Sequence, residues 1–196
     1  EANSIGQLVV SETARNLTRI FFLQDRLKSA TGAPTEQVKR VHVVGAGTMG
    51  GDIAAWCALQ GMTVTLQDQE VKFIAPAIKR AGDLAKRRAR GRERDMMDRL
   101  IPDVAGAGAA RADLVIEAIV EDVEAKRGLF GAMESRLKER AILSTNTSSI
   151  PLEAIAEGLT DPGKLVGIHF FNPVAIMPLV EIVHGDKTKL LSTERA

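Results

Sequence analysis

A glycine-rich motif in the first third of the chain constrains its fold more than any other feature. The motif fits the pattern G-x-G-x-x-G and consists of Gly45, Ala46, Gly47, Thr48, Met49 and Gly50. It follows a short β-branched run, 41–44, and opens a segment of helical pattern, 49–60. In that context the first glycine permits a tight turn, the second lets a pyrophosphate approach the backbone, and the third lets the helix pack on the strand. We therefore predict that Gly45, Gly47, Thr48, Met49 and Gly50 contribute to a dinucleotide site at a helix N-terminus.

An acidic residue at the end of the next strand indicates which dinucleotide binds. The run 63–67 reads as a strand and ends at Asp68, about twenty residues after the motif. A carboxylate there accepts hydrogen bonds from a ribose 2′-hydroxyl and repels a 2′-phosphate, which favours NAD over NADP. The loop by itself remains compatible with FAD and other nucleotides, and it defines a ligand without defining a reaction.

Strand and helix patterns alternate through the rest of the chain. Further strands are expected at 112–119, 141–145, 166–170 and 179–183, and helices at 75–100, 123–137 and 152–159. A loop of small residues is expected at 106–110, and the polar tail 187–196 is expected to fray. This alternation predicts an α/β fold of the doubly wound Rossmann type, with a mostly parallel sheet covered on both faces.

Composition excludes several classes of protein. The chain has 196 residues, 45% of them hydrophobic, and a formal net charge of +1, so no bulk field attracts nucleic acid or a membrane surface. Cys57 is the single cysteine, which rules out an internal disulfide, favours a reducing compartment and cannot form a metal site alone. No apolar run approaches the roughly 18 residues of a membrane span. The first residue is Glu1 rather than Met, so the sequence is silent on a targeting peptide.

The first part of the chain reads as a separate amphipathic helix. Ser11 and Glu12 can start it, and the segment 31–34 contains Gly32 and Pro34, which stop helices. Its apolar positions recur at three- and four-residue steps and are Ala14, Leu17, Ile20, Phe21, Leu23 and Leu27. Two interpretations remain open: a peripheral helix packed on the main domain, or a linker to a domain that precedes it.

Three later segments narrow the family. They are Glu117-Ala118-Ile119-Val120-Glu121 followed by Lys126, then Ser144-Thr145-Asn146-Thr147-Ser148-Ser149-Ile150, then His169-Phe170-Phe171-Asn172-Pro173 followed by Met177-Pro178-Leu179-Val180-Glu181. In this order and spacing they closely resemble the L-3-hydroxyacyl-CoA dehydrogenase family, over residues 38–181. The resemblance implies NAD as cofactor, a (3S)-3-hydroxyacyl-CoA as substrate and 3-oxoacyl-CoA as product. The opening helix is similar to the connector of multifunctional fatty-acid β-oxidation enzymes, which favours the linker interpretation.

The resemblance also implies a larger parent protein. Residues 1–37 would be the linker and residues 38–196 the NAD-binding domain. An enoyl-CoA hydratase domain would precede the linker, and a helical domain absent from this chain would follow and close over the substrate. A thiolase subunit is an expected partner, and a bacterial cytoplasm the expected location. A stand-alone 3-hydroxybutyryl-CoA dehydrogenase and a non-catalytic NAD-binding relative are the alternatives.

The chemistry of alcohol oxidation suggests roles for three polar residues. Imidazole is the side chain most often used as a general base, so His169 suits a base that accepts the hydroxyl proton. Glu181, on the following strand, can orient the ring, and the Ser148 hydroxyl can donate to the reacting oxygen. The structural alternatives are a core histidine, an edge-strand carboxylate and a helix cap for the segment that starts near residue 152. The resemblance favours a catalytic base, its partner and a substrate contact.

The resemblance extends to the cofactor. Glu121, Lys126 and Asn172 match positions that touch the nicotinamide end of NAD, and Asn146 is assigned to the cofactor site with them. No residue is predicted to bind a metal. The predicted helix 75–100 carries a run of basic residues. They either form a solvated face of that helix or bind the 3′-phosphate of CoA. They are Lys79, Arg80, Lys86, Arg87, Arg88, Arg90, Arg92 and Arg94.

Overall fold

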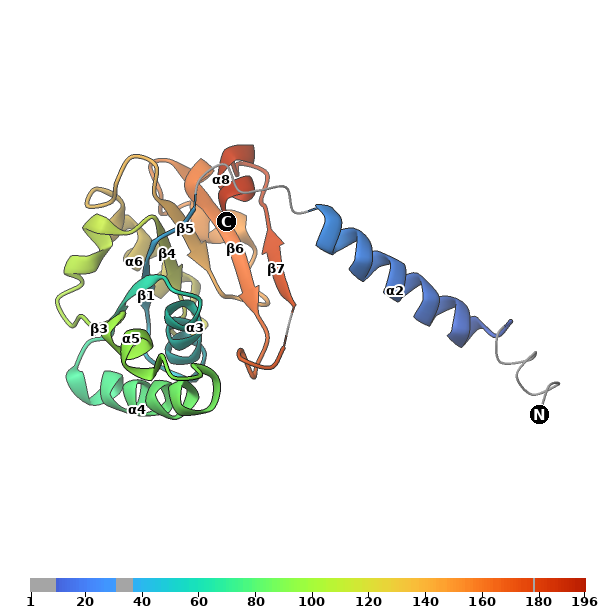
Figure 1. Cartoon of the computed structure of the whole chain (residues 1–196). Helices are drawn as coiled ribbons and strands as arrows, with labels where there is room; N and C mark the ends of the chain where they lie inside the picture. The colour runs from blue at the N-terminus through green and yellow to red at the C-terminus, as the bar shows by residue number, and fades with distance from the viewer. Residues whose placement is uncertain (1–9, 31–36, 178) are drawn as a thin grey trace. The chain divides into compact units, whose positions relative to one another are not determined.

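The computed structural model describes residues 10–30, 37–177 and 179–196 (Figure 1). The chain divides into two compact units, residues 1–36 and residues 37–196. The first unit contains helix α2, Glu12–Ala30. The Ser11 hydroxyl accepts a hydrogen bond from the Ala14 amide at 3.2 Å, which is the predicted start of this helix. The expected helix stop at 31–34 lies outside the described residues.

The second unit is built around a seven-stranded sheet. Its strands are β1 Arg40–Val44, β2 Thr63–Gln67, β3 Leu100–Pro102, β4 Leu114–Glu117, β5 Ile142–Thr145, β6 Leu165–Phe170 and β7 Val180–Val183. They follow the order β3-β2-β1-β4-β5-β6-β7, and all neighbours are parallel except β6 and β7. The chain winds outward from β1 to β3, returns to β4 and winds the other way, so the predicted doubly wound fold is confirmed.

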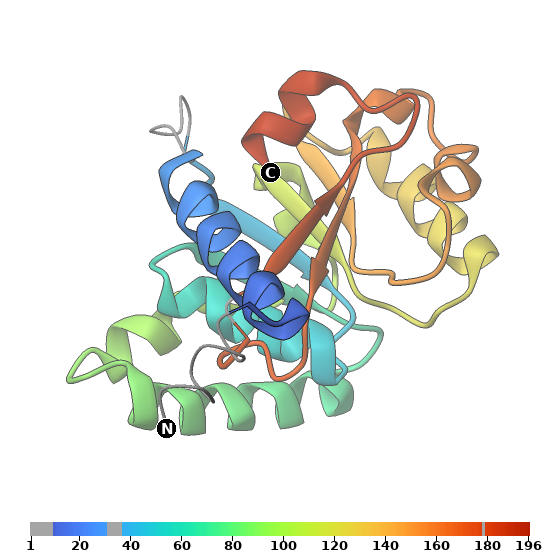
Figure 2. The same ribbon diagram turned by 90° about the vertical axis from the view of Figure 1, so that its right-hand side faces the viewer.

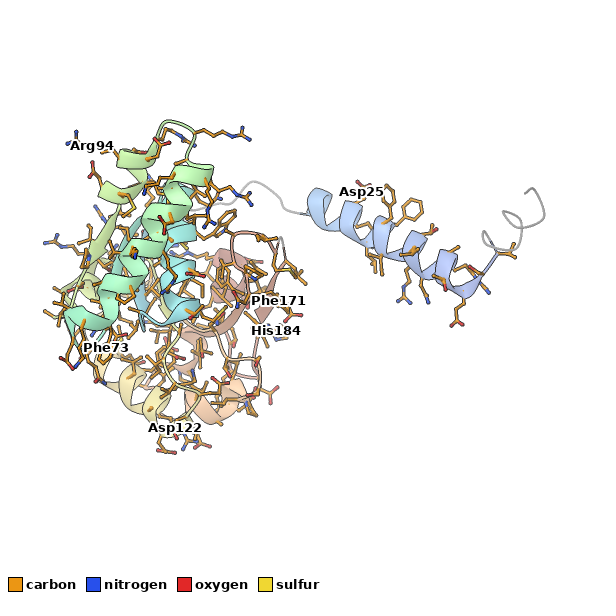
Figure 3. The ribbon with its side chains drawn as sticks, turned by 90° about the horizontal axis from the view of Figure 1, so that it is seen from below. Asp25, Phe73, Arg94, Asp122, Phe171 and His184 are labelled. Carbon is orange, nitrogen blue, oxygen red and sulfur yellow. The ribbon has the colours of Figure 1, made fainter. Side chains whose placement is uncertain are left out.

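Helices cover both faces of this sheet. They are α3 Thr48–Leu59, α4 Val71–Arg88, α5 Glu93–Asp98, α6 Val123–Glu134, α7 Leu152–Ala156 and α8 Leu190–Arg195, with short 3₁₀ turns η1 Ala107–Arg111 and η2 Pro162–Lys164. Alternate strand residues such as Val41 and Val43 pack with Ile53 of α3 and Ile74 of α4, whereas Val115 and Leu143 pack with Phe130 of α6. Figure 3 shows α4 and α6 on opposite sides of the sheet.

The region between residues 75 and 111 departs from the sequence expectation. The predicted single helix 75–100 is wrong, because α4 ends at Arg88 and the chain then turns through Arg90 and Gly91, whose φ angles are 49° and 85°. Glycine adopts such angles without strain, and this turn separates α4 from α5. The unpredicted strand β3 follows and forms one edge of the sheet, and the expected small-residue loop is largely the 3₁₀ turn η1.

The C-terminal tail also differs from expectation. Residues 190–195 form α8, and the Ser192 hydroxyl donates to the Gly163 carbonyl at 2.9 Å. The Thr188 hydroxyl donates to the Leu165 carbonyl at 2.7 Å, and the Lys189 ammonium pairs with Asp161 at 2.7 Å. The prediction that this tail frays was wrong, because several polar side chains fasten it to the start of β6.

Candidate functional site

The glycine loop between β1 and α3 has the geometry that its sequence predicts. Gly45 has a φ of 100°, and a Cβ there would stand 2.5 Å from the Ala118 carbonyl oxygen. A Cβ at Gly50 would stand 1.9 Å from the Gly45 oxygen, so α3 approaches the loop too closely for any side chain. A Cβ at Gly47 would meet nothing within 4 Å. The loop therefore packs tightly on its inner side and is open where a pyrophosphate would approach.

The loop lies at the point where the sheet reverses its winding, between the carboxyl ends of β1 and β4. Two cavities flank it. The first, which we call the Asp68 cavity, has a volume of about 740 Å³ and is lined by Gly45, Asp68, Phe73 and Ile119 among others. Asp68 accepts a hydrogen bond from the Ala46 amide at 2.7 Å. A carboxylate has about four acceptor positions, so this bond leaves capacity for a ribose hydroxyl.

The second cavity, which we call the His169 cavity, lies on the other side of the loop and has a volume of about 500 Å³. It brings together most of the residues that the sequence singled out. The predicted site residues that line this cavity are Gly47, Thr48, Met49, Glu121, Lys126, Asn146, Ser148, His169 and Asn172. Gly47 lines both cavities, so a dinucleotide that spans them would cross the loop at this glycine. The structure therefore offers a cradle whose shape and donors fit NAD.

His169 and Glu181 are directly opposite each other in the antiparallel pairing of β6 and β7, which run side by side in Figure 2. The His169 Nδ1 atom lies 2.9 Å from the Glu181 Oε2 atom, and the ring stacks at a tilt on Phe171, with 4.5 Å between centroids. A carboxylate at this distance fixes the tautomer in which Nδ1 carries the proton. The Nε2 atom is then an acceptor, as a proton-abstracting base requires.

Ser148 lies in a loop that is fastened on both sides of it. The hydroxyls of Thr147 and Ser149 both donate to the Glu121 carboxylate, the latter at 3.0 Å. The Thr147 oxygen also accepts the Ile150 amide at 3.0 Å. In the described residues no side chain caps α7, so the helix-cap interpretation of Ser148 does not hold. Ser148 instead lines the His169 cavity.

Lys126 enters the cavity from the first turn of α6, which begins after the Asp122 cap labelled in Figure 3. The Lys126 side chain is 1% exposed, and its Nζ atom lies 2.7 Å from Glu117 and 3.3 Å from Glu121. Glu117 is fully buried and also accepts the Ile119 amide at 2.7 Å and the Thr145 hydroxyl at 2.6 Å. The sequence alone suggested no role for Glu117. The signal that could have revealed it is a carboxylate placed at the end of a run of apolar residues.

The two asparagines of the candidate site differ in their contacts. Asn146 follows β5, and its side-chain oxygen accepts the Phe170 amide at 2.8 Å, next to His169. Its own amide donates to the Glu117 carbonyl at 2.9 Å. Asn146 therefore ties together the carboxyl ends of β4, β5 and β6. Asn172 lines the His169 cavity, where its assignment to the cofactor stays a prediction.

Part of the basic run gathers at a third cavity, of about 360 Å³, which α3 and α4 form with residues 173–176. Arg80, Arg87 and Arg88 line it. Arg80 pairs with Asp52 at 3.0 Å and donates to the Gly47 carbonyl at 2.9 Å. It thereby links α4 to the glycine loop. The assignment of this surface to the CoA phosphate stays a prediction.

Two features are absent from the described part of the chain. No helix there is long and apolar enough to cross a membrane. No group of three or more His, Cys, Asp or Glu side chains there is placed to hold a metal ion.

Comparisons with known proteins identify the family of this domain. Residues 40–196 match the family described as 3-hydroxyacyl-CoA dehydrogenase, NAD binding domain. The fatty acid oxidation complex subunit alpha of Pseudomonas entomophila is 34% identical to this chain over an alignment 197 residues long. The alignment covers 96% of this chain and 28% of that protein. The chain thus spans little more than a quarter of the length of such curated relatives.

Solved structures of dehydrogenases share the fold. That of 3-hydroxybutyryl-CoA dehydrogenase from Escherichia coli superposes with a TM-score of 0.77 at 38% identity, covering 81% of this chain and 35% of that one. The (S)-3-hydroxybutyryl-CoA dehydrogenase of Ralstonia eutropha gives a TM-score of 0.73 at 29% identity, covering 80% and 58%. The chain belongs to the family of NAD-binding domains of 3-hydroxyacyl-CoA dehydrogenases, with NAD as its cofactor.

Proposed function

We propose that this chain supplies the NAD-binding domain and the base of an enzyme that oxidises (3S)-3-hydroxyacyl-CoA to 3-oxoacyl-CoA. The observation that carries the proposal is that His169, which is bonded to Glu181, lines a cavity together with Ser148 beside the glycine loop. A base oriented by a carboxylate, beside a hydroxyl donor and a dinucleotide cradle, is the arrangement that alcohol oxidation needs.

The cofactor would be held by the residues of both cavities. Gly45, Gly47 and Gly50 form the phosphate turn, and Asp68 would accept the adenosine ribose hydroxyls. Bound NAD supplies the acceptor for the hydride that leaves the substrate carbon. Glu121, Lys126 and Asn172, with Asn146 beside them, would surround the nicotinamide end.

The residues of the His169 cavity would then handle the proton. His169 takes the hydroxyl proton of the substrate on Nε2, because Glu181 holds the proton on Nδ1. The Glu181 carboxylate stabilises the imidazolium that results, and its place directly across the strand pair keeps the ring oriented. Ser148 donates a hydrogen bond to the substrate oxygen, whose negative charge grows as the proton leaves.

We place the domain in a longer multifunctional protein of fatty-acid β-oxidation. An alignment that covers 96% of this chain must extend into the segment before residue 40, where the family match begins, so α2 has a counterpart in the Pseudomonas entomophila relative. This supports residues 1–37 as a linker and residues 38–196 as the domain. An upstream enoyl-CoA hydratase domain, a C-terminal helical domain, a thiolase partner and a cytoplasmic location belong to the same proposal.

The similarity to the Ralstonia eutropha enzyme supports a second candidate, a stand-alone 3-hydroxybutyryl-CoA dehydrogenase. This candidate leaves α2 without a role, whereas the longer protein gives it one. A non-catalytic NAD-binding relative would have no chemical need for His169 and Ser148 at one cavity with Glu181 bonded to His169.

Two measurements test the proposal. The first titrates this chain with NADH and NADPH and follows energy transfer from Trp56 in α3, the single tryptophan. We expect saturable NADH binding and much weaker NADPH binding, because Asp68 repels a 2′-phosphate. The second compares His169→Gln with the unaltered longer protein that carries this domain, using acetoacetyl-CoA and NADH. A loss of about 10²–10⁴-fold in kcat/KM is expected for a positioned base, and a loss below tenfold would contradict the assignment.

A further inference from the structure

Three charged side chains contact one another in series, from the core of the domain to the His169 cavity. Glu117 at the end of β4 is fully buried and contacts the Lys126 ammonium at 2.7 Å. Lys126 contacts the Glu121 carboxylate at 3.3 Å, and Glu121 is 45% exposed at the cavity. We call these residues the Glu117–Lys126–Glu121 relay. Two carboxylates and one ammonium leave it with one uncompensated negative charge.

The contacts of the relay place that charge on Glu121. Glu117 has its carboxylate occupied by Lys126, the Ile119 amide and the Thr145 hydroxyl, and it has no access to solvent. Glu121 is partly buried, which by itself raises the pKa of its carboxyl. The hydroxyls of Thr147 and Ser149 and the Lys126 ammonium outweigh that effect, and the pKa is lowered overall. Glu121 is therefore ionised at neutral pH and faces the cavity.

A fixed negative charge discriminates between the two redox forms of a nicotinamide. The oxidised ring carries a positive charge and the reduced ring is neutral, so the Coulomb attraction acts on one form alone. Partial exclusion of water from a cavity strengthens that attraction relative to bulk solution. The direction of the effect follows from the sign of the charge, and its size depends on how far the ring lies from Glu121.

We propose that the Glu117–Lys126–Glu121 relay biases this site toward the oxidised dinucleotide, with Glu121 as the discriminating charge and Glu117 as a positioning residue. Glu117 acts by holding Lys126, which in turn holds Glu121 beside the ring. The inference rests on the proposed function in one respect, since it requires the nicotinamide to occupy the His169 cavity.

The first test replaces Glu121 by Gln, which removes the charge and keeps an oxygen that can accept the Thr147 and Ser149 hydroxyls. Dissociation constants of this chain are measured for NADH by energy transfer from Trp56 and for NAD⁺ by competition. We expect Glu121→Gln to lower the preference for NAD⁺ over NADH by about tenfold, the effect of one unit charge at several ångströms in a partly solvated site. The matched control is Glu124→Gln, because Glu124 lies only three residues further along, in the first turn of α6, and pairs with Arg127 outside the cavity.

The second test addresses the positioning role. Glu117→Gln takes the buried partner from Lys126 and is expected to weaken NAD⁺ binding by about tenfold and NADH binding less, since Glu121 is no longer held beside the ring. Thr145→Val removes a neutral donor from the same carboxylate and is expected to leave both dissociation constants within about twofold. A residue that merely supported the fold would lower the melting temperature in both variants without changing either affinity.

The outcomes separate the inference from the proposed function. If the unaltered chain binds neither form, the placement of the nicotinamide fails and the inference falls with it. If the chain binds both forms but Glu121→Gln leaves their ratio within about twofold, the inference alone is overturned. If Glu117→Gln does not fold by circular dichroism, Glu121→Gln decides the discrimination and Glu117→Asp, which keeps the charge on a shorter side chain, replaces it in the second test. A ratio of the two affinities unchanged in Glu117→Asp would overturn the positioning role.

Discussion

The Lys126–Glu117 pair in the centre of the sheet and the His169–Glu181 pair near its edge join similar groups in opposite surroundings. The atoms are 2.7 Å apart in the first pair and 2.9 Å apart in the second. The side chains of the first pair are at most 1% exposed, whereas those of the second are 20% and 50% exposed. β4 is buried throughout, and β7 is exposed throughout.

Because the two pairs differ in burial, we expect one to control stability and the other to control chemistry. A charge buried without its partner is costly, so a central pair holds the fold and the geometry of the cavity. A pair near the edge is open to solvent and contributes little to stability, so under the proposed function we expect its loss to change chemistry more than stability. The following predictions test this division, beginning with the largest effect.

Removing the ammonium from the central pair should destabilise the domain most. Lys126→Met leaves Glu117 buried without its cation, and we expect a loss of about 3–5 kcal/mol in the free energy of unfolding. Urea denaturation followed by Trp56 fluorescence measures it. The control is Lys138→Met, whose partner Asp113 is partly exposed and keeps its hydrogen bonds from the Lys39 and Arg40 amides, so the loss should be at most about 1 kcal/mol. Equal losses in the two variants would contradict the comparison.

Altering the edge pair should affect catalysis with little effect on folding. Glu181→Gln no longer holds the proton on His169 Nδ1, and kcat/KM of the longer protein should fall about 100-fold, equivalent to about 2.7 kcal/mol. The free energy of unfolding should change by no more than about 0.5 kcal/mol, because the side chain is half exposed. Glu139→Gln, at an exposed position, serves as the control. A large loss of stability with unchanged kcat/KM would reverse the assigned roles.

Two glycines of the loop extend the comparison to backbone packing, because Gly50 lies on the packed side of the loop and Gly47 on its open side. Gly50→Ala places a Cβ against the Gly45 carbonyl and should cost about 1–3 kcal/mol of stability, as overpacking does. Gly47→Ala meets nothing within 4 Å, so it should leave stability nearly unchanged and weaken NADH binding. Thermal denaturation and NADH titration of both variants measure the two effects. Similar stabilities for the two variants would show that α3 can move away from the loop.

The smallest expected effect comes from His42, a buried residue of β1. Its ring bonds to Thr65 at 2.7 Å and to Gln67 at 2.8 Å, and it lies 4.0 Å from Asp103. Burial lowers the pKa of His42 below its ordinary 6.5, against the opposing effects of Gln67 and Asp103 and with a smaller contribution from Arg136.

The sign of the pH dependence follows from that shift. The folded state keeps the ring neutral while the unfolded chain takes up a proton below about pH 6.5, so stability is complete above this pH and falls as the pH drops below it. The slope is at most about 1.4 kcal/mol per pH unit. His42→Gln should flatten the profile of unfolding free energy between pH 6.5 and pH 5, and a profile as steep as that of the unaltered chain would assign the effect to another group.

Local patterns were sufficient for much of this structure. The β-branched runs predicted β1 and β2 closely, and the glycine motif predicted the turn between β1 and α3, because close packing leaves few residue types possible there. The Arg90–Gly91 turn was missed because a single glycine in a helical pattern is ambiguous. The three residues of β3 were too few to show a period.

The site could be predicted in part for a similar reason. His169, Glu181 and Ser148 stand in motifs, and their residue types suggest chemistry before any contact is known. Glu117 stands in a motif as well, but its role depends on a lysine that α6 brings back to the end of β4, and spacing along the chain does not report that distance. The ordered tail was missed for the same reason, since Gly163 and Leu165 provide its partners from a remote segment.

The register of β6 and β7 has a consequence for how the His169–Glu181 pair can be lost. The two residues face each other because they are paired across hydrogen-bonded antiparallel strands. Side chains alternate between the two faces along a strand, so a shift of the pairing by one residue would place His169 and Glu181 on opposite faces of the sheet. An insertion or deletion of a single residue within either strand would therefore separate the pair while leaving both side chains in the sequence.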